Sequence, residues 1–272
     1  MSHREQYKGI VSGILSGDSM IIRFIDPQIV AIQNVCLEHL IAPKYGKTDG
    51  NIRDEPHAYE SWNFLRNLCI GQPVLVSPPT NKSTLTRTHP AFGKMPVIFT
   101  RVSLRSRNNA DVGLICVEAG WVRIRSPRNR DSYVNSLLAG EASAKSKKIG
   151  IWRPNGFIRP LPVHYEANDL LAIGEFNAVV ETVINGTTVA LFLIPHHEHI
   201  IFQIAACRSP SAKRDNSAQF GSEARQFTVK NFLHRSTKVR LCSANREGLF
   251  MGTILDRSDR AIRNLIAEGL AR

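Results

Sequence analysis

Apolar and polar residues alternate on both sides of a glycine turn in the segment Lys8–Phe24, which reads KGIVSGILSGDSMIIRF. Alternation with a period of two is typical of a strand with one buried face. The Ser-Gly-Asp step at the centre is typical of a tight turn, in which glycine accepts a positive φ. The pattern therefore predicts a β-hairpin with Gly17 in its turn.

The same pattern occurs again at Asn177–Leu193, NAVVETVINGTTVALFL. When Gly17 is aligned with Gly186, apolar residues match apolar residues on both sides of the turn, and the offset of about 169 residues persists further along the chain. A repeat of this length indicates a duplicated domain. We therefore expect two domains of one fold.

Periods of three and four residues predict three helices in the first copy. The first covers HAYESWNFLRNLC, with Pro56 in its first turn, and ends at Gly71. The second covers residues 111–118, and the third covers 130–152. The lysines of the third helix, at 145, 147 and 148, are expected on its solvated face, with phosphate binding as the alternative. Strands are expected at 73–77 and 97–102, separated by a loop at 78–90.

The repeat sets the domain boundaries. We expect a first domain at 1–155, a proline-rich linker at 156–174 and a second domain at 175–272. In the second copy SEARQFTVKNFL matches DEPHAYESWNFL and NLIAEGLAR matches ICVEAGWVR, but no match to the third helix follows. The expectation is that the sequence is a piece of a longer protein, or that another segment such as the linker covers the corresponding surface.

Positive charge is concentrated in the first half of the chain. The 272 residues carry a formal net charge of +12, and residues 1–155 hold 21 basic and 12 acidic side chains. This excess favours a polyanionic partner, a nucleic acid before a membrane surface, although a basic protein without such a partner has the same composition. The five cysteines lack CxxC spacing, and no apolar run reaches the roughly 20 residues that span a bilayer. We expect an intracellular protein, cytoplasmic and also nuclear, that does not bind membranes.

Eight segments in matching order resemble the staphylococcal nuclease domain, specifically the tandem arrays of the Tudor staphylococcal nuclease family. These segments are the SGDSMII and NGTTVAL hairpins, LIAPK and CRSPS, DEPHAYESWNFLRNLCIGQPV, FGK at 92–94, VEAGWVRIR and LLAGEASAKSKKIGIW. The resemblance implies an α+β fold, with a five-stranded OB-type β-barrel and helices in each of two tandem domains. OB barrels commonly hold single-stranded nucleic acid across one face.

The enzyme of this family hydrolyses a phosphodiester with one Ca²⁺, a glutamate base and two arginines that stabilise the charge on phosphorus. In the first copy the resemblance places the first aspartate ligand at Asp18 and the second arginine at Lys94. The other positions have changed: they are Cys36 for the first arginine, Ile41 for the second aspartate, Ala42 for the threonine whose carbonyl binds metal, and Lys44 for the glutamate.

The second copy departs further from the enzyme. In the order aspartate, arginine, aspartate, threonine, glutamate, arginine, its residues are Thr187, Gln203, Arg208, Ser209, Ser211 and Leu249. A guanidinium at a ligand position repels a cation, so the second copy should bind no metal. Asp18 alone supplies far fewer oxygens than the six to eight that Ca²⁺ takes. We therefore expect that the protein requires no cofactor. Ca²⁺ would bind in the first copy only where RNA phosphates complete its coordination shell.

The replacements favour phosphate binding without activation of water. The expected nucleic-acid-binding residues are Lys44, Lys94, Gln203 and Arg208, and Asp18 keeps the residual metal-ligand and catalytic position. The alternatives are that Asp18 is a turn residue that bonds its own backbone, and that Lys44 and Arg208 point into solvent.

Two further features have ordinary structural explanations. The HHEH run at 196–199 contains metal-ligating residue types, but it falls in the loop between barrel strands. The three tryptophans could stack on bases, yet their positions on helices or at helix ends favour core packing.

Three functions are consistent with the sequence. The first, which the resemblance implies, is an RNA-binding scaffold in RNA silencing complexes (RISC) or RNA turnover, with single- or double-stranded RNA and silencing proteins as partners and no sequence preference. The second is a weak Ca²⁺-dependent ribonuclease. The third is a protein-interaction module whose charge is incidental. Salt sensitivity of RNA binding separates the third from the first, and dependence on Ca²⁺ separates the second.

Overall fold

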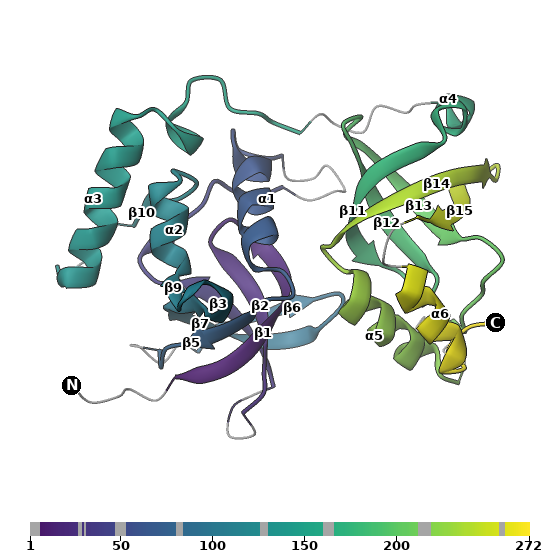
Figure 1. The fold of residues 1–272 in the computed structure, drawn as a ribbon, viewed down its shortest axis with the longest axis horizontal. Helices are drawn as coiled ribbons and strands as arrows, with labels where there is room; N and C mark the ends of the chain where they lie inside the picture. Colours follow the sequence, from purple (N-terminus) through teal and green to yellow (C-terminus); the bar gives the residue numbers. More distant parts are fainter. Residues whose placement is uncertain are drawn as a thin grey trace. The chain divides into compact units, whose positions relative to one another are not determined.

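The computed structural model describes residues 6–26, 29, 31–46, 53–79, 84–125, 130–159, 166–211, 219–255 and 259–272. The chain divides into two compact units, residues 1–159 and 160–272 (Figure 1). The fold is α+β, as predicted from the sequence. The segment predicted as a linker begins with residues of the first unit, at 156–159, and it contains helix α4 of the second unit, Ala167–Ile173.

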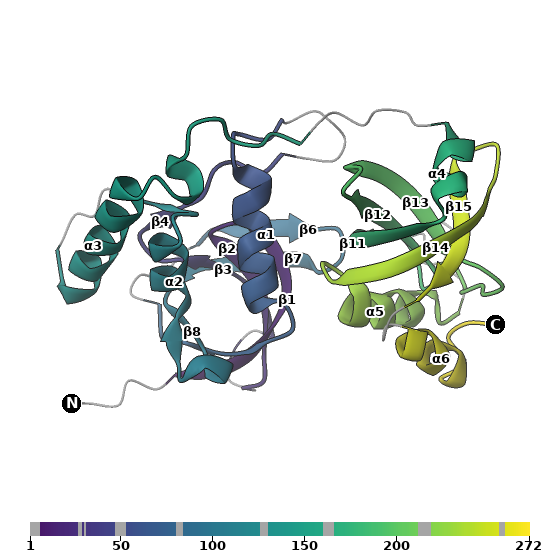
Figure 2. The ribbon, with the colours of Figure 1, turned by 45° about the horizontal axis from the view of Figure 1, so that its top comes forward.

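The first unit consists of strands and three α-helices. The strands are β1 Tyr7–Ser16, β2 Ser19–Phe24, β3 Ile32–Leu37, β4 Leu40–Ile41, β5 Pro73–Val76, β6 Thr86–His89, β7 Gly93–Thr100, β8 Val102–Leu104, β9 Ala110–Asp111 and β10 Arg123–Ile124. The helices are α1 Ala58–Cys69, α2 Val112–Glu118 and α3 Ser132–Ser146, with 3-10 turns at Arg105–Arg107 and Gly150–Trp152. Helix α1 packs against β1, and α2 lies beside α3 (Figure 2).

The main sheet of the first unit has the order β6-β7-β3-β2-β1-β5-β8-β9. Strand β7 pairs with β3 in parallel, and β8 pairs with β5 in antiparallel orientation. In the chain, β7 and β8 are separated by Arg101 alone, although they lie at opposite ends of the run β7-β3-β2-β1-β5-β8. The sheet therefore curls round until its two ends meet. Counted as one interrupted strand, β7 and β8 give the same five-strand order as the second unit.

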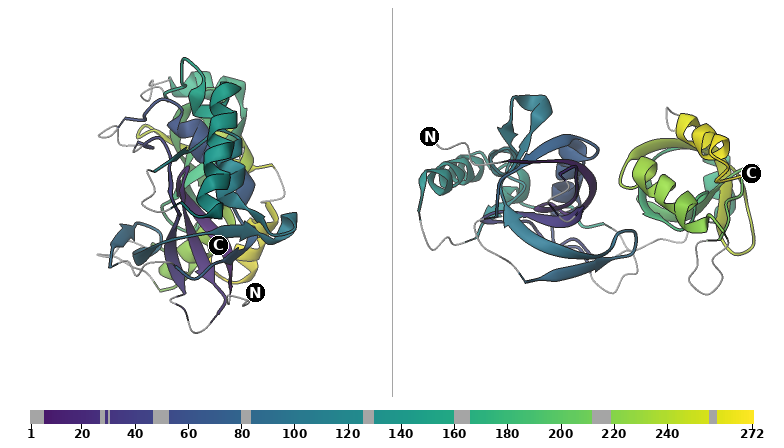
Figure 3. Two further views of the ribbon diagram at one scale, coloured as in Figure 1. Left: turned by 90° about the vertical axis from the view of Figure 1, so that its left-hand side faces the viewer. Right: turned by 90° about the horizontal axis from the view of Figure 1, so that it is seen from below.

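The second unit contains a closed barrel of the order β11-β12-β13-β15-β14, which Figure 3 shows nearly end-on in its right-hand view. The strands are β11 Glu175–Val183, β12 Thr188–Ile194, β13 Glu198–Ile204, β14 Ser236–Ala244 and β15 Leu249–Ile254. Helices α5 Gly221–Phe232 and α6 Asp259–Ala267 contact each other. The five-stranded barrel predicted from the sequence is confirmed in this unit.

The two hairpins of the repeat have the same strand register. Val11 pairs with Ile22 in the first unit, and Val180 pairs with Leu191 in the second. Each register shifts by one residue directly afterwards, before Gly13 and before Thr182. A shared pairing and a shared bulge are what a duplicated domain produces, because both the hydrophobic pattern and the bulge determine register.

The predicted reason for glycine in the two hairpin turns is wrong. Neither Gly17 nor Gly186 has a positive φ. Both instead lie against another segment: a Cβ on Gly17 would approach Ser61 Oγ to 1.8 Å, and a Cβ on Gly186 would approach the Cβ of Ala224 to 2.8 Å. These glycines permit close approach of a helix rather than an unusual turn.

Three further local predictions need correction. Helix α1 begins one residue after His57, whose φ of 66° stops the helix from including Pro56. Helix α3 ends at Ser146, and Lys148 with a φ of 50° turns the chain away. Strand β6 lies within the segment predicted as a loop at 78–90, and it pairs with the start of β7.

The core of the first unit is built around α1. Trp62 is 2% exposed, and its indole Nε1 donates a hydrogen bond to the carbonyl of Ile14 at 3.1 Å. This satisfies the one polar atom of a large apolar ring and attaches α1 to β1. The core role predicted for Trp62 is confirmed, whereas Trp121 and Trp152 are half-buried.

Candidate nucleic-acid interface

Asp18 lies in the two-residue turn that joins β1 to β2, and its side chain is half-buried. Its carboxylate Oδ1 accepts a hydrogen bond from Ser16 Oγ at 2.5 Å, and its backbone carbonyl accepts one from Leu37 N at 2.8 Å. Asp18 therefore lies in the turn, but the described hydrogen bond of its side chain comes from the Ser16 side chain and not from the backbone, as the alternative interpretation expected. The hydrogen bond to its carbonyl brings the end of β3 to this turn.

Cys36, at the position that the resemblance assigns to the first phosphate arginine, lies on β3 and is 7% exposed. Burial, with a smaller contribution from the Asp18 carboxylate, raises the pKa of the Cys36 thiol to about 11. The thiol is therefore protonated near neutral pH. Its effect on Cys36 shows that the Asp18 charge lies within electrostatic reach of this strand.

Two arginines also act on Cys36 from outside β3. The charges of Arg87, on β6, and Arg125, just after β10, both lower the Cys36 pKa and partly oppose the effect of burial. Both side chains are exposed. Arg125 is anchored by a hydrogen bond from its backbone N to the carbonyl of His39, 2.7 Å away. Two exposed guanidinium groups therefore lie within electrostatic reach of Cys36, at positions that the family pattern did not indicate.

Lys44 is exposed in the segment after β4. Its backbone N donates to Glu55 Oε2 at 2.8 Å, and its carbonyl accepts from Glu55 N at 2.9 Å. Ala42, two residues earlier, is buried against the hairpin turn, 3.0 Å from where a Cβ of Gly17 would lie. The hydrogen bonds to Glu55 thus fix the backbone of Lys44, two residues after the Ala42 that touches the Asp18 turn. The Lys44 side chain remains exposed.

Lys94 lies at the start of β7, exposed, and pairs with Thr88 of β6. The next pair of the same ladder joins Met95 to Arg87. Lys94 therefore belongs to the same two-stranded ribbon as Arg87. The described contacts do not join Lys94 directly to Asp18 or Lys44.

The described residues do not form a metal centre around Asp18. Among them there is no group of three or more His, Cys, Asp or Glu side chains that could hold a metal ion. The HHEH run is no exception: His199 Nδ1 lies 2.8 Å from Glu181 Oε2, an ion pair when the imidazole is protonated.

The second unit has neutral polar side chains at the corresponding turn. Thr187 is 2% exposed, and its Oγ1 accepts from Ser209 N at 3.3 Å. Its carbonyl accepts from Ile204 N at 3.0 Å, which is the counterpart of the Asp18–Leu37 hydrogen bond. The duplicated backbone geometry is thus retained where the carboxylate is replaced.

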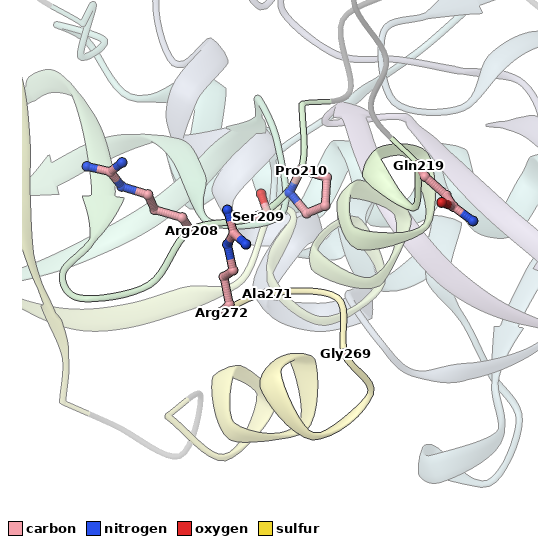
Figure 4. A pocket seen from close by; sticks show the side chains of 7 residues that line it. All are labelled: Arg208, Ser209, Pro210, Gln219, Gly269, Ala271 and Arg272. Carbon is pink, nitrogen blue, oxygen red and sulfur yellow. The ribbon is translucent and has the colours of Figure 1, made fainter.

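Arg208 is exposed and lines a pocket of about 480 Å³ in the second unit, together with Ser209, Pro210, Gln219, Gly269, Ala271 and Arg272. The backbones of Arg208 and Arg272 form two reciprocal hydrogen bonds of 2.7 and 2.9 Å. Figure 4 shows two guanidinium groups extending from these adjacent backbone positions. The described lining residues include two arginines and no acidic side chain, which suits an anion.

Strand register corrects one aligned position in the second unit. Val97 of β7 pairs with Asn34, and Leu249 of β15 pairs with Ile201, which corresponds to Asn34 in the repeat. Leu249 therefore matches Val97 and not Lys94, whose position lies outside the paired residues. Gln203 is half-buried on β13 and corresponds to Cys36.

Sequence reasoning missed Arg87 and Arg125. Arg87 lies in a segment interpreted as a loop. The signal that could have found Arg87 is the short alternating run TRTH beside the FGK segment, which is typical of a hairpin strand.

Comparison with known proteins identifies relatives over most of the chain. No family model matches the sequence. Staphylococcal nuclease domain-containing protein 1 of Drosophila melanogaster is 28% identical over 97% of this chain and 30% of its own length. The protein of the same name in Schizosaccharomyces pombe is 27% identical over 94% of this chain, and Ribonuclease TUDOR 2 of Arabidopsis thaliana is 27% identical over 78%. The chain spans less than a third of the length of these relatives.

Proposed function

We propose that this chain, a relative of the staphylococcal nuclease domain proteins, binds RNA through the basic surface around its altered nuclease pockets and does not cleave it. The observation that carries the proposal is that the exposed Arg87 and Arg125 both lie within electrostatic reach of Cys36, as does the Asp18 charge. Lys44 is exposed as well, and we take these three cations to be the groups that bind phosphate. The described residues offer no cluster of metal ligands beside them.

The chemistry of these groups fits phosphate better than hydrolysis. Guanidinium groups match two phosphate oxygens, and the ammonium of Lys44 adds a point charge. The resemblance places the glutamate base at Lys44, and the carboxylate of Glu55 is engaged in a hydrogen bond from the Lys44 backbone. We expect binding to the sugar-phosphate backbone without sequence preference. We further propose a scaffold role in RNA silencing or turnover complexes, in the cytoplasm and the nucleus.

A weak Ca²⁺-dependent ribonuclease is the second candidate. One observation favours it: Asp18 is half-exposed and retains the first ligand position. A single carboxylate leaves most of the Ca²⁺ shell to water and RNA phosphates. Activity of this kind would need Ca²⁺ and would vanish in Asp18→Ala.

The experiment incubates labelled single-stranded and double-stranded RNA with the wild type, Asp18→Ala and Lys44→Glu, in Ca²⁺ or in chelator. We expect intact RNA in every lane, equal binding by the wild type with and without Ca²⁺, and weaker binding by Lys44→Glu. Lys8→Glu is the matched control, because Lys8 is exposed on β1 about 25 Å along the strand from the Asp18 turn. Cleavage that requires both Ca²⁺ and Asp18 would establish the ribonuclease instead.

A further inference from the structure

Residues Arg153–Arg159, which we call the strap, lie across the start of α1. The backbone N of His57 donates to the carbonyl of Phe157 at 2.9 Å, and His57 Nε2 lies 3.2 Å from the carbonyl of Arg153. A Cβ on Gly156 would approach the His57 ring to 2.6 Å. The strap is therefore held to the first unit at several points, and its last residue directly precedes the second unit in the chain.

The end of the strap makes a buried ion pair. Arg159 Nε and a terminal nitrogen of its guanidinium donate to the two carboxylate oxygens of Asp54 at 2.7 and 2.9 Å. The side chains are 6% and 2% exposed. The Arg159 guanidinium also lies over the ring of Tyr45, 4.1 Å from its centroid. This two-point contact fixes Asp54 in one orientation.

Asp54 in turn holds the loop that carries Lys44. Its Oδ1 accepts a hydrogen bond from the backbone N of Gly46 at 2.7 Å. The neighbouring residue, Glu55, holds Lys44 itself through two hydrogen bonds to its backbone. Residues 44–46 are therefore clamped between Arg159 and the 54–55 segment, with the Tyr45 ring in contact with the arginine.

A buried ion pair is a weak source of stability, because removing two charges from water offsets most of their attraction. What it does supply is a fixed geometry. Ordering a loop before a ligand arrives removes an entropic cost from binding, so a clamped loop binds more tightly than a mobile one.

We propose that Arg159 is a positioning residue for the contact of Lys44 with RNA phosphate. The inference rests on the function proposed above for Lys44. Through Asp54 and Tyr45, Arg159 holds the 44–46 loop so that the exposed ammonium is presented to the RNA. The strap that leads into the second unit thereby takes part in RNA binding by the first.

The test replaces the ion pair by apolar residues, Arg159→Met with Asp54→Leu, and compares this paired variant with Lys44→Ala and with the triple variant. We expect the paired variant to melt within a few degrees of the wild type, and the amides of Tyr45 and Gly46 to exchange with solvent at least about tenfold faster. RNA affinity should fall by about three- to tenfold, as it does in Lys44→Ala, and adding Lys44→Ala to the paired variant should cause little further loss.

Arg153→Met is the matched control in the same strap. Arg153 pairs with Glu60 through an exposed contact and should leave exchange at residues 45–46 unchanged. Arg159→Lys is a second probe that keeps the charge but loses the two-point contact, and it should speed exchange at the same amides.

Two results overturn the role of Arg159: wild-type exchange at residues 45–46 in the paired variant, or a full additional loss of affinity when Lys44→Ala is added to it. Unchanged RNA binding by Lys44→Ala overturns the proposed function of Lys44, and with it the role of Arg159 in that contact. In that case, faster amide exchange at residues 45–46 in the paired variant would show that Arg159 and Asp54 still hold the loop, and that only the role of Lys44 in RNA binding has failed.

Discussion

Gly17 and Ser61 are so close that a Cβ on the glycine would lie 1.8 Å from the hydroxyl oxygen of the serine. Ser61 is in turn fixed by donating a hydrogen bond to the carbonyl of Trp121 at 2.7 Å. The second unit repeats the contact with Gly186 and Ala224. In both units the hairpin turn that contains the position assigned by the resemblance to a metal ligand is thus pressed against the first long helix after it.

Gly17→Ala is expected to destabilise the first unit by about 1–3 kcal/mol, because overpacking forces the hairpin away from α1. The measurement is urea unfolding of the full chain, monitored by probes in each unit. The expected result is a lower midpoint for the first unit and an unchanged midpoint for the second. Gly186→Ala should reverse the pattern.

The double variant Gly17→Ala with Ser61→Ala is the control. Removing the serine oxygen leaves the Cβ of residue 61 at 2.9 Å, about the separation in the second unit. The double variant should therefore lose less stability than the sum of the single variants. Strict additivity would contradict the contact as the cause.

The repeat allowed much of the fold to be predicted, and the close approaches explain what was missed. The apolar alternation around Gly17 predicted the hairpin and its register, because a one-residue slip would expose its buried face. The reason for the glycine depends on Ser61, 44 residues later, which no local pattern shows. The start of α1 was likewise set by His57, whose backbone pairs with the distant Phe157.

The candidate site was predictable only where the family pattern marks a position. Asp18 and Lys44 were found by alignment with Gly17 and Pro43. Arg87 and Arg125 are held within electrostatic reach of Cys36 through strand pairing and through the hydrogen bond to His39, and these depend on tertiary structure. Charge composition predicted that cations gather in the first unit but could not assign them to a surface.

Cysteine accessibility gives a second prediction. Four of the five thiols are buried, and burial raises the pKa of Cys36 to about 11 and that of Cys69 to about 12. Cys242 is exposed. Ellman's reagent at pH 8 should therefore titrate one thiol in the native chain and five after denaturation. Cys242→Ser should remove the fast reaction, and a second fast thiol in that variant would contradict the assignment.

His197 predicts a pH dependence of stability. Burial, followed by the charges of His196 and His199, lowers the pKa of His197 below its unfolded value of about 6.5. The folded state therefore binds fewer protons than the unfolded state in this range, and stability falls as pH drops from about 6.5 through the lowered folded pKa. The measurement is the free energy of unfolding of the wild type at a series of pH values.

His197→Asn isolates this effect. The φ of His197 is 60°, a left-handed conformation that asparagine tolerates, so the substitution should add little strain. The wild type should lose stability relative to the variant as pH falls below about 6.5. Parallel curves for the two proteins between pH 5 and 8 would assign the pH dependence to other groups.

Arg87 and Arg125 predict the salt dependence of RNA binding. If each contacts a phosphate, each neutralising substitution, Arg87→Gln or Arg125→Gln, should weaken binding to single-stranded RNA and reduce the slope of log affinity against log salt by about 0.7. Arg105→Gln is the matched control, because Arg105 is an exposed arginine on the 3-10 turn after β8 and is not among the charges that act on Cys36.

Because Arg87 and Arg125 act on one buried thiol, their loss should also raise the Cys36 pKa, independently of RNA. A raised Cys36 pKa with an unchanged salt slope would place both guanidinium groups near Cys36 but outside the RNA contact. A reduced slope in Arg105→Gln as well would mean that RNA is attracted by overall charge and not by Arg87 and Arg125.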